Sequence, residues 1–117
     1  MKRVLAIDDD PSILAVVKDI LSSSGYTIST VPSATEALER IEVDSFDLVI
    51  TDLRMPGMSG QELITQLRQH PTYGKVPIVV LATGAEEAET AHLKVDMRVG
   101  KPFAPRTLLA AVTALIG

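Results

Sequence analysis

The chain has no cysteine and no tryptophan, and aromatic residues make up only 3% of its 117 residues. The absence of cysteine excludes disulfides, thiolate metal sites and cysteine nucleophiles, and it is compatible with the reducing cytoplasm, where we expect the chain to reside. Because 46% of the residues are hydrophobic and so few are aromatic, the core must be aliphatic. Such a composition is typical of helices packed on a β-branched sheet.

Basic residues are also few, since 11 Lys and Arg stand against 15 Asp and Glu, for a net charge of -4. They are scattered along the chain, whereas binding to nucleic-acid phosphates needs clustered basic side chains, so we expect no direct nucleic-acid partner. No apolar run is long enough for a signal peptide or a membrane-spanning helix, so we expect no membrane insertion. The length predicts a single domain over residues 1–117.

Short β-rich segments alternate with longer amphipathic segments, a pattern that predicts an α/β fold with a parallel sheet covered by helices on both faces. The expected strands are Arg3–Ile7, Thr27–Val31, Leu48–Thr51, Ile78–Ala82 and Val95–Val99. The expected helices run from Pro11 to a stop at Gly25, from Ser33 past Ile41, from Gly60 to His70, from Glu86 to Leu93, and from Pro105 to Ile116. Asp10, followed by Pro11, is the expected cap of the first of them.

Residues 48–60, which read L-V-I-T-D-L-R-M-P-G-M-S-G, carry the most informative motif. An apolar strand delivers Asp52 to its carboxyl end, and a Pro-Gly loop leads to a helix that Ser59 opens through an S-x-x-E capping box. Gly57 and Gly60 allow the loop to turn tightly or to approach another group closely. Reacting groups in open α/β sheets lie just past the carboxyl ends of strands, so Asp52 is the candidate reactive residue.

Polar side chains end four of the expected strands: Asp8 and Asp9, Asp52, Thr83 and Lys101. If the first and third strands are neighbours, three carboxylates converge and require a cation, for which Mg²⁺ is the best candidate. Lys101 supplies a charge for an anion, and Thr83 supplies a hydroxyl. Together these groups predict a phosphoryl-transfer site in which Asp52, already ionised, accepts the phosphoryl group as an acyl phosphate.

The acidic pair, the D-x-x-M-P-G-M-x-G segment that starts at Asp52, and the K-P-F triplet at Lys101 resemble the receiver domain of two-component response regulators, over essentially the whole chain. The resemblance implies a flavodoxin-like (CheY-like), doubly wound sheet of five parallel strands in the order 2-1-3-4-5, with five helices. It also implies that Asp52 takes a phosphoryl group from the phosphohistidine of a sensor histidine kinase or a histidine phosphotransfer protein. The phosphorylated domain would then change its binding to a downstream protein target.

The resemblance further implies a set of metal ligands. Asp9 would bind Mg²⁺ directly, Asp8 mainly through water, and Asp52 and the backbone carbonyl of Arg54 would complete the protein's share. Lys101 would hold the phosphoryl oxygens, and its bond to the following proline is usually cis in the family. Such a domain phosphorylates and dephosphorylates only itself, so we do not expect an enzyme that acts on a separate substrate.

Two positions depart from the family pattern. The hydroxyl usually comes one residue earlier, at the position of Ala82, although Thr83 is followed by the expected small residue. Arg98 stands where the family commonly has an aromatic switch, three residues before Lys101. These departures leave an alternative open, a degenerate receiver that binds its partner without phosphorylation. A flavodoxin-like cofactor carrier is disfavoured, because the chain has no glycine-rich phosphate loop and no tryptophan.

Overall fold

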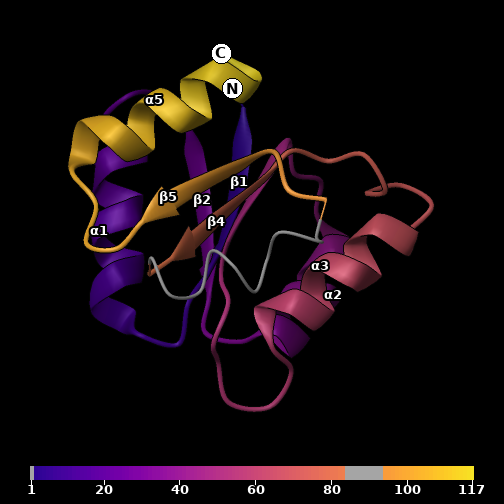
Figure 1. Ribbon diagram of the computed structural model, residues 1–117. Coiled ribbons are helices and arrows are strands. Elements are labelled where there is room, and N and C mark those ends of the chain that lie inside the picture. The colour runs from indigo at the N-terminus through magenta and orange to yellow at the C-terminus, as the bar shows by residue number, and fades with distance from the viewer. Residues whose placement is uncertain (1, 84–93) are drawn as a thin grey trace.

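The computed structural model describes residues 2–83 and 94–117, which form a parallel sheet of five strands in the order β2-β1-β3-β4-β5 (Figure 1). The strands are β1 Arg3–Ile7, β2 Thr27–Val31, β3 Leu48–Asp52, β4 Ile78–Ala82 and β5 Met97–Gly100. The sheet, its parallel sense and its strand order confirm the expected flavodoxin-like architecture.

Helices cover both faces of the sheet, as Figure 1 shows, with α1 (Pro11–Ser22) and α5 (Pro105–Ile116) on one face and α2 (Ala34–Val43) and α3 (Gly60–Gln69) on the other. These are the four helices of the described part of the chain. The further helix expected over Glu86–Leu93 lies outside the described residues. Within residues 2–83 and 94–117, no helix has both the length and the apolar character needed to cross a membrane.

The sheet separates two aliphatic cores because alternate side chains of a strand point to opposite faces. Val49 and Val80 pack with the residues of α2 and α3, whereas Ile50 and Leu81 pack with those of α1 and α5. Every residue of β3 and β4 is buried, which explains why these strands read as continuous apolar runs. The central strands therefore give the site at their carboxyl ends a rigid base.

Three helices begin at the capping residues that the sequence predicts. Asp10 accepts a hydrogen bond from the backbone N–H of Ser12, and Ser33 and Ser59 cap α2 and α3 in the same way. Gly25 terminates the first helix as expected, and the regular hydrogen bonding of α1 ends at Ser22, just before it. The chain folds back there through a hydrogen bond from Tyr26 N–H to the Leu21 carbonyl, and Gly25 adopts a left-handed φ of 94° within that turn.

The expected bounds of the last strand, Val95–Val99, also need correction, since β5 spans Met97–Gly100. The preceding residues lie outside the parallel ladder and are held by side-chain contacts and by a backbone hydrogen bond from the Asp96 N–H to the Ile78 carbonyl at 3.0 Å. The Asp96 carboxylate accepts hydrogen bonds from the Ile78 N–H at 2.8 Å and from the Arg68 guanidinium at 3.2 Å, and Arg68 also binds the Lys94 carbonyl at 2.8 Å. The ladder begins only where Met97 pairs with Val79.

Candidate functional site

The acidic residues of the predicted site lie together at the carboxyl edge of the sheet. Strand β1 pairs with β3 in a register that places Ile7 beside Thr51, so Asp8 and Asp52, the next residues along each strand, are neighbours. One carboxylate oxygen from each of Asp8, Asp9 and Asp52 lies within 4.8 Å of the others. The first and third strands are therefore neighbours, which is the condition under which the sequence predicts that the three carboxylates converge.

The carboxylate cluster suits a small divalent cation. Asp8 and Asp52 are 1% and 6% exposed, while Asp9 is exposed to solvent. Two buried carboxylates with a third at their exposed side repel one another, and hard oxygen ligands favour Mg²⁺ or a similar ion. The exposed position of Asp9 leaves an open side on which a metal ion could keep its waters. The donor set thus fits the ion that the sequence predicts.

Lys101 lies between the two buried carboxylates. It directly follows β5, and its backbone N–H donates to the Ala82 carbonyl at 2.9 Å, which fixes it to the end of β4. Its Nζ lies 3.2 Å from Oδ2 of Asp8 and 3.1 Å from Oδ1 of Asp52. The Lys101–Pro102 peptide bond is cis, as the resemblance implies. The ammonium therefore bridges the same two oxygen-bearing groups that a metal ion would contact.

Burial and charge shift the protonation of these groups in ways that match their contacts. Burial raises the pKa of Asp8 above its usual value of 3.8, and the nearby Asp52 raises it further, against the lowering effects of the Asp10 N–H and Lys101. Burial alone would lower the pKa of Lys101, but its hydrogen bond with Asp52 and the charges of both carboxylates outweigh burial and raise it. Lys101 therefore stays a cation at neutral pH.

The backbone around Asp52 is held tightly. Leu53 N–H donates to Oδ1 of Asp52 at 2.8 Å, and Gly60 N–H donates to the Leu53 carbonyl at 2.9 Å. A Cβ atom on Gly60 would overlap the Asp52 carbonyl oxygen and would lie 2.8 Å from Cα of Leu53. Gly60 thus provides the predicted close approach, and Gly57, with a φ of 78°, provides the predicted tight turn.

The remaining predicted site residues lie at the same edge of the sheet. Thr83 directly follows β4 and is exposed, whereas Ala82, the competing position, is the fully buried last residue of that strand and carries no hydroxyl. Arg54 is exposed, two residues past Asp52. These placements are compatible with the expected roles of the Thr83 hydroxyl and the Arg54 carbonyl, and both roles stay predictions.

Two other polar residues have structural partners away from the proposed chemistry. Asp10 caps α1, as the following proline predicts, and the pKa of its carboxyl is lowered by hydrogen bonds from Ser12. His70 contacts Glu42 at 2.9 Å, away from the cluster. The sequence argument overlooked Thr51, a fully buried hydroxyl beside Asp52. The sequence did hold one indication of a role for this hydroxyl, because Thr51 interrupts the apolar run that precedes Asp52.

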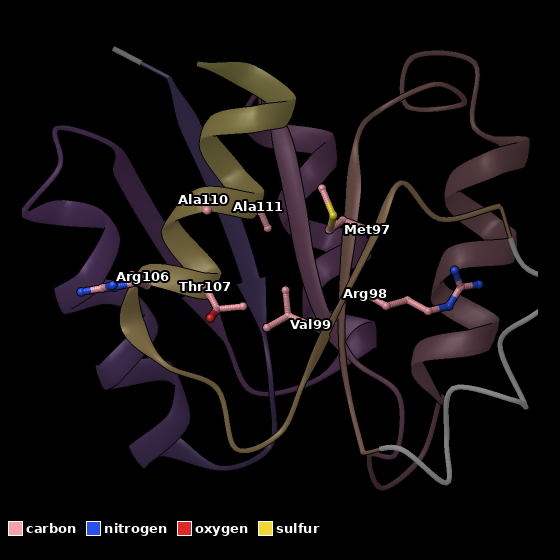
Figure 2. A pocket seen from close by; sticks show the side chains of 7 residues that line it. All are labelled: Met97, Arg98, Val99, Arg106, Thr107, Ala110 and Ala111. Atoms are coloured by element: carbon pink, nitrogen blue, oxygen red, sulfur yellow. The ribbon is translucent and has the colours of Figure 1, made fainter.

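A cavity of about 610 Å³ lies apart from the carboxylates, between β5 and α5 (Figure 2). Its lining consists of Met97, Arg98, Val99, Arg106, Thr107, Ala110 and Ala111. Figure 2 shows that the side chains of Arg98 and Arg106 extend in opposite directions, so the two charges do not converge on one ligand. The Arg98 side chain, at the position of the family's aromatic switch, extends away from α5 (Figure 2).

Comparisons with known proteins identify the family of the chain. The family model of the response regulator receiver domain matches residues 4–113. The alkaline phosphatase synthesis transcriptional regulatory protein PhoP of Bacillus subtilis is 34% identical over 118 residues, which cover 98% of this chain and 48% of that protein. The sensor histidine kinase TmoS of Ectopseudomonas mendocina is 35% identical over 117 residues, which cover 97% of this chain and 12% of that protein.

Solved structures give the same result. The chemotaxis response regulator CheY4 of Vibrio cholerae superimposes with a TM-score of 0.92 at 33% identity, covering 99% of each chain. The response regulator TrrA of Thermotoga maritima, solved in complex with Mg(2+)-BeF, has a TM-score of 0.90 at 32% identity, covering 99% of this chain and 100% of that one. The chain spans about half the length of the first curated relatives that it matches. Because the family model extends over nearly all of its elements, this chain belongs to the response regulator receiver domain family of two-component systems.

Proposed function

We propose that Asp52 accepts a phosphoryl group and that its phosphorylation controls the binding of a protein partner. The observation that carries this proposal is the bridging of two buried carboxylates, Asp8 and Asp52, by the Lys101 ammonium at the carboxyl edge of the sheet. A nucleophilic carboxylate beside a fixed cation and further oxygen ligands is the arrangement that phosphoryl transfer needs, since catalysis there consists mainly of positioning and charge stabilisation.

Each residue has a defined part in the transfer. An oxygen of Asp52 forms a bond to phosphorus while the bond from phosphorus to the donor's imidazole nitrogen breaks, and that nitrogen keeps the electron pair. Lys101 moves from the carboxylates to the phosphoryl oxygens, and the Thr83 hydroxyl binds another of them. Asp8, Asp9, Asp52 and the Arg54 carbonyl would hold Mg²⁺, which when bound supplies charge stabilisation for the transferring oxygens.

The partners follow from the chemistry of an acyl phosphate. The donor is a sensor histidine kinase or a histidine phosphotransfer protein, because a phosphoimidazole can pass its phosphoryl group to a carboxylate. Part of TmoS, itself described as a sensor histidine kinase, resembles this chain, which supports the assignment to such pathways. In this proposal the chain acts in the cytoplasm as a stoichiometric acceptor, not as an enzyme, and passes its signal to a downstream protein.

The competing proposal is a degenerate receiver that binds its partner without phosphorylation. The observation that favours it is Arg98 on β5, in place of the aromatic side chain that commonly switches in the family. The intact set of Asp8, Asp9, Asp52 and Lys101 favours phosphorylation instead.

The test is intact-mass measurement after incubation with phosphoramidate or acetyl phosphate, with and without Mg²⁺. The wild type is expected to gain a single phosphoryl adduct that requires Mg²⁺ and that Asp52→Asn abolishes. Asp19→Asn, which makes the same charge change at an exposed position of α1, is the matched control and is expected to behave as the wild type. A wild-type protein that takes up no phosphoryl group from either donor would select the degenerate receiver.

A further inference from the structure

Thr51 is a buried polar residue with no part in the proposed transfer so far. Its exposure is 0%, and in the described part of the chain the only other buried polar residues are Asp8 and Asp52. Thr51 lies in β3 between Ile7 of β1 and Val80 of β4. Burying a hydroxyl costs free energy unless it is hydrogen-bonded, and a valine of the same shape would avoid that cost. The hydroxyl therefore calls for an explanation.

The hydroxyl of Thr51 is bonded to the phosphoacceptor's own backbone. Its Oγ1 donates to the Asp52 carbonyl oxygen at 2.7 Å. That carbonyl and the Leu53 N–H belong to one planar peptide group. At the other end of the same group, Leu53 N–H donates to Oδ1 of Asp52 at 2.8 Å. A constraint applied by Thr51 at the carbonyl end is thus transmitted through a rigid plane to the carboxylate.

Gly60 constrains the same carbonyl from the first turn of α3. Its Cα packs so closely that an added Cβ would overlap the Asp52 carbonyl oxygen. The peptide between Asp52 and Leu53 is therefore held between the Thr51 hydroxyl and the α3 backbone, and it has little freedom to rotate.

The consequence concerns the two oxygens of the Asp52 carboxylate. Oδ1 accepts the Leu53 N–H and also contacts Lys101 Nζ at 3.1 Å. Neither of these two contacts involves Oδ2. We propose that Thr51 is a positioning residue: through the peptide between Asp52 and Leu53 it holds Oδ1 in place and leaves Oδ2 as the oxygen that attacks phosphorus. This inference rests on the proposed phosphoacceptor function of Asp52.

Loss of the Thr51 hydroxyl should slow the transfer step. With phosphoramidate as donor, Oδ2 forms the new bond to phosphorus while the phosphorus–nitrogen bond breaks, and the nitrogen leaves with the electron pair and a proton from water as ammonia. A misplacement of about 1 Å can cost roughly 100-fold in rate. Because the Lys101 contact persists without the hydroxyl and the Leu53 hydrogen bond is weakened but not lost, we expect phosphorylation of Thr51→Val to be about 10-fold slower than that of the wild type.

The experiment compares Thr51→Val, which keeps the shape and removes the hydroxyl, with Thr51→Ser, which keeps the hydroxyl. Ile50→Val is the matched control, since it perturbs the same strand but its side chain packs on the opposite face. Two readouts are measured: the rate of adduct formation from phosphoramidate at saturating Mg²⁺, and the NMR chemical shift of the Leu53 amide proton, which reports its bond to the carboxylate without any phosphoryl group.

Slow phosphorylation and an upfield Leu53 shift in Thr51→Val alone, with Thr51→Ser and Ile50→Val close to the wild type, would support the proposal. A wild-type rate in Thr51→Val would overturn it, as would an equal slowing in Ile50→Val, because the effect would then be one of general strand stability. A wild type that forms no adduct would overturn the phosphoacceptor function itself, which separates the two failures.

Discussion

Replacing Lys101 with methionine should destabilise the metal-free protein and increase the stabilisation that Mg²⁺ provides. The variant keeps most of the side chain's volume and removes a charge that contacts Asp8 at 3.2 Å and Asp52 at 3.1 Å. The side chains of these two carboxylates are 2% and 9% exposed, so water cannot replace the ammonium fully. Without Lys101 the two carboxylates repel each other with no cation between them.

The magnitude follows from the burial of the partners. Breaking a buried ion pair typically costs about 3–5 kcal/mol, and because the Lys101 side chain is 22% exposed and partly screened, we expect about 2–3 kcal/mol in EDTA. For a chain of this size that loss corresponds to a fall in Tm of roughly 8–12 °C. A metal ion at 100 times its Kd stabilises by about 2.7 kcal/mol, and this gain should be larger in Lys101→Met, where no ammonium competes for Asp8.

Thermal unfolding followed by circular dichroism, in EDTA and in Mg²⁺, provides the assay. Lys18→Met, which removes an exposed charge from α1, is the control and should change stability by less than about 0.5 kcal/mol. Adding Asp8→Asn to Lys101→Met should restore stability in EDTA, because it removes one of the two repelling charges and keeps an acceptor for the Asp10 N–H. A Lys101→Met protein as stable in EDTA as the wild type, or one whose response to Mg²⁺ equals that of the wild type, would refute the bridging role of Lys101.

Three further predictions concern the same edge of the sheet. Gly60→Ala should lower the free energy of unfolding in urea by about 3 kcal/mol, because the added Cβ meets backbone atoms that cannot move aside. Gly100→Ala is the control, since a Cβ there would have no atom within 4 Å. Equal losses in the two variants would contradict the steric argument. The pKa of Asp8 is raised in the folded state, so without metal its contribution to stability is present below pH 3.8 and is lost as the pH rises through the folded-state pKa. Protonated Asp8 cannot bind a metal ion, and the increase in Tm that Mg²⁺ causes should therefore shrink as the pH falls from 7. An increase that stayed constant would argue against Asp8 as a ligand. Arg54→Ala should change the lifetime of the acyl phosphate, measured by intact mass after removal of the donor, since a long side chain two residues from Asp52 can shield it from water; equal lifetimes would remove this idea.

The local structure was predictable because it depends on neighbours in the sequence. Apolar runs defined β3 and β4, Ser33 and Ser59 marked helix starts, and Asp52 was expected at the end of a strand because the apolar run stops there. The predicted start of the last strand was wrong because residues distant in the sequence contact the chain there. The start of β5 is delayed because Asp96 bonds to Ile78 and Arg68, which the local pattern of residues 95–99 does not reveal.

The sequence by itself determined the candidate residues for the chemistry: a carboxylate at the end of a buried strand, an acidic pair, and a lysine in a K-P-F setting. Only the tertiary structure decided how they meet. Lys101 and Asp8 are 93 residues apart in the chain and come into contact because the order β2-β1-β3-β4-β5 places the ends of β1, β3 and β5 at one edge. The proposed role of the Thr51 hydroxyl also required the structure. Its hydrogen-bond partner is the Asp52 carbonyl, whose orientation is imposed by the packing of Gly60 against it, and no residue pattern encodes that orientation.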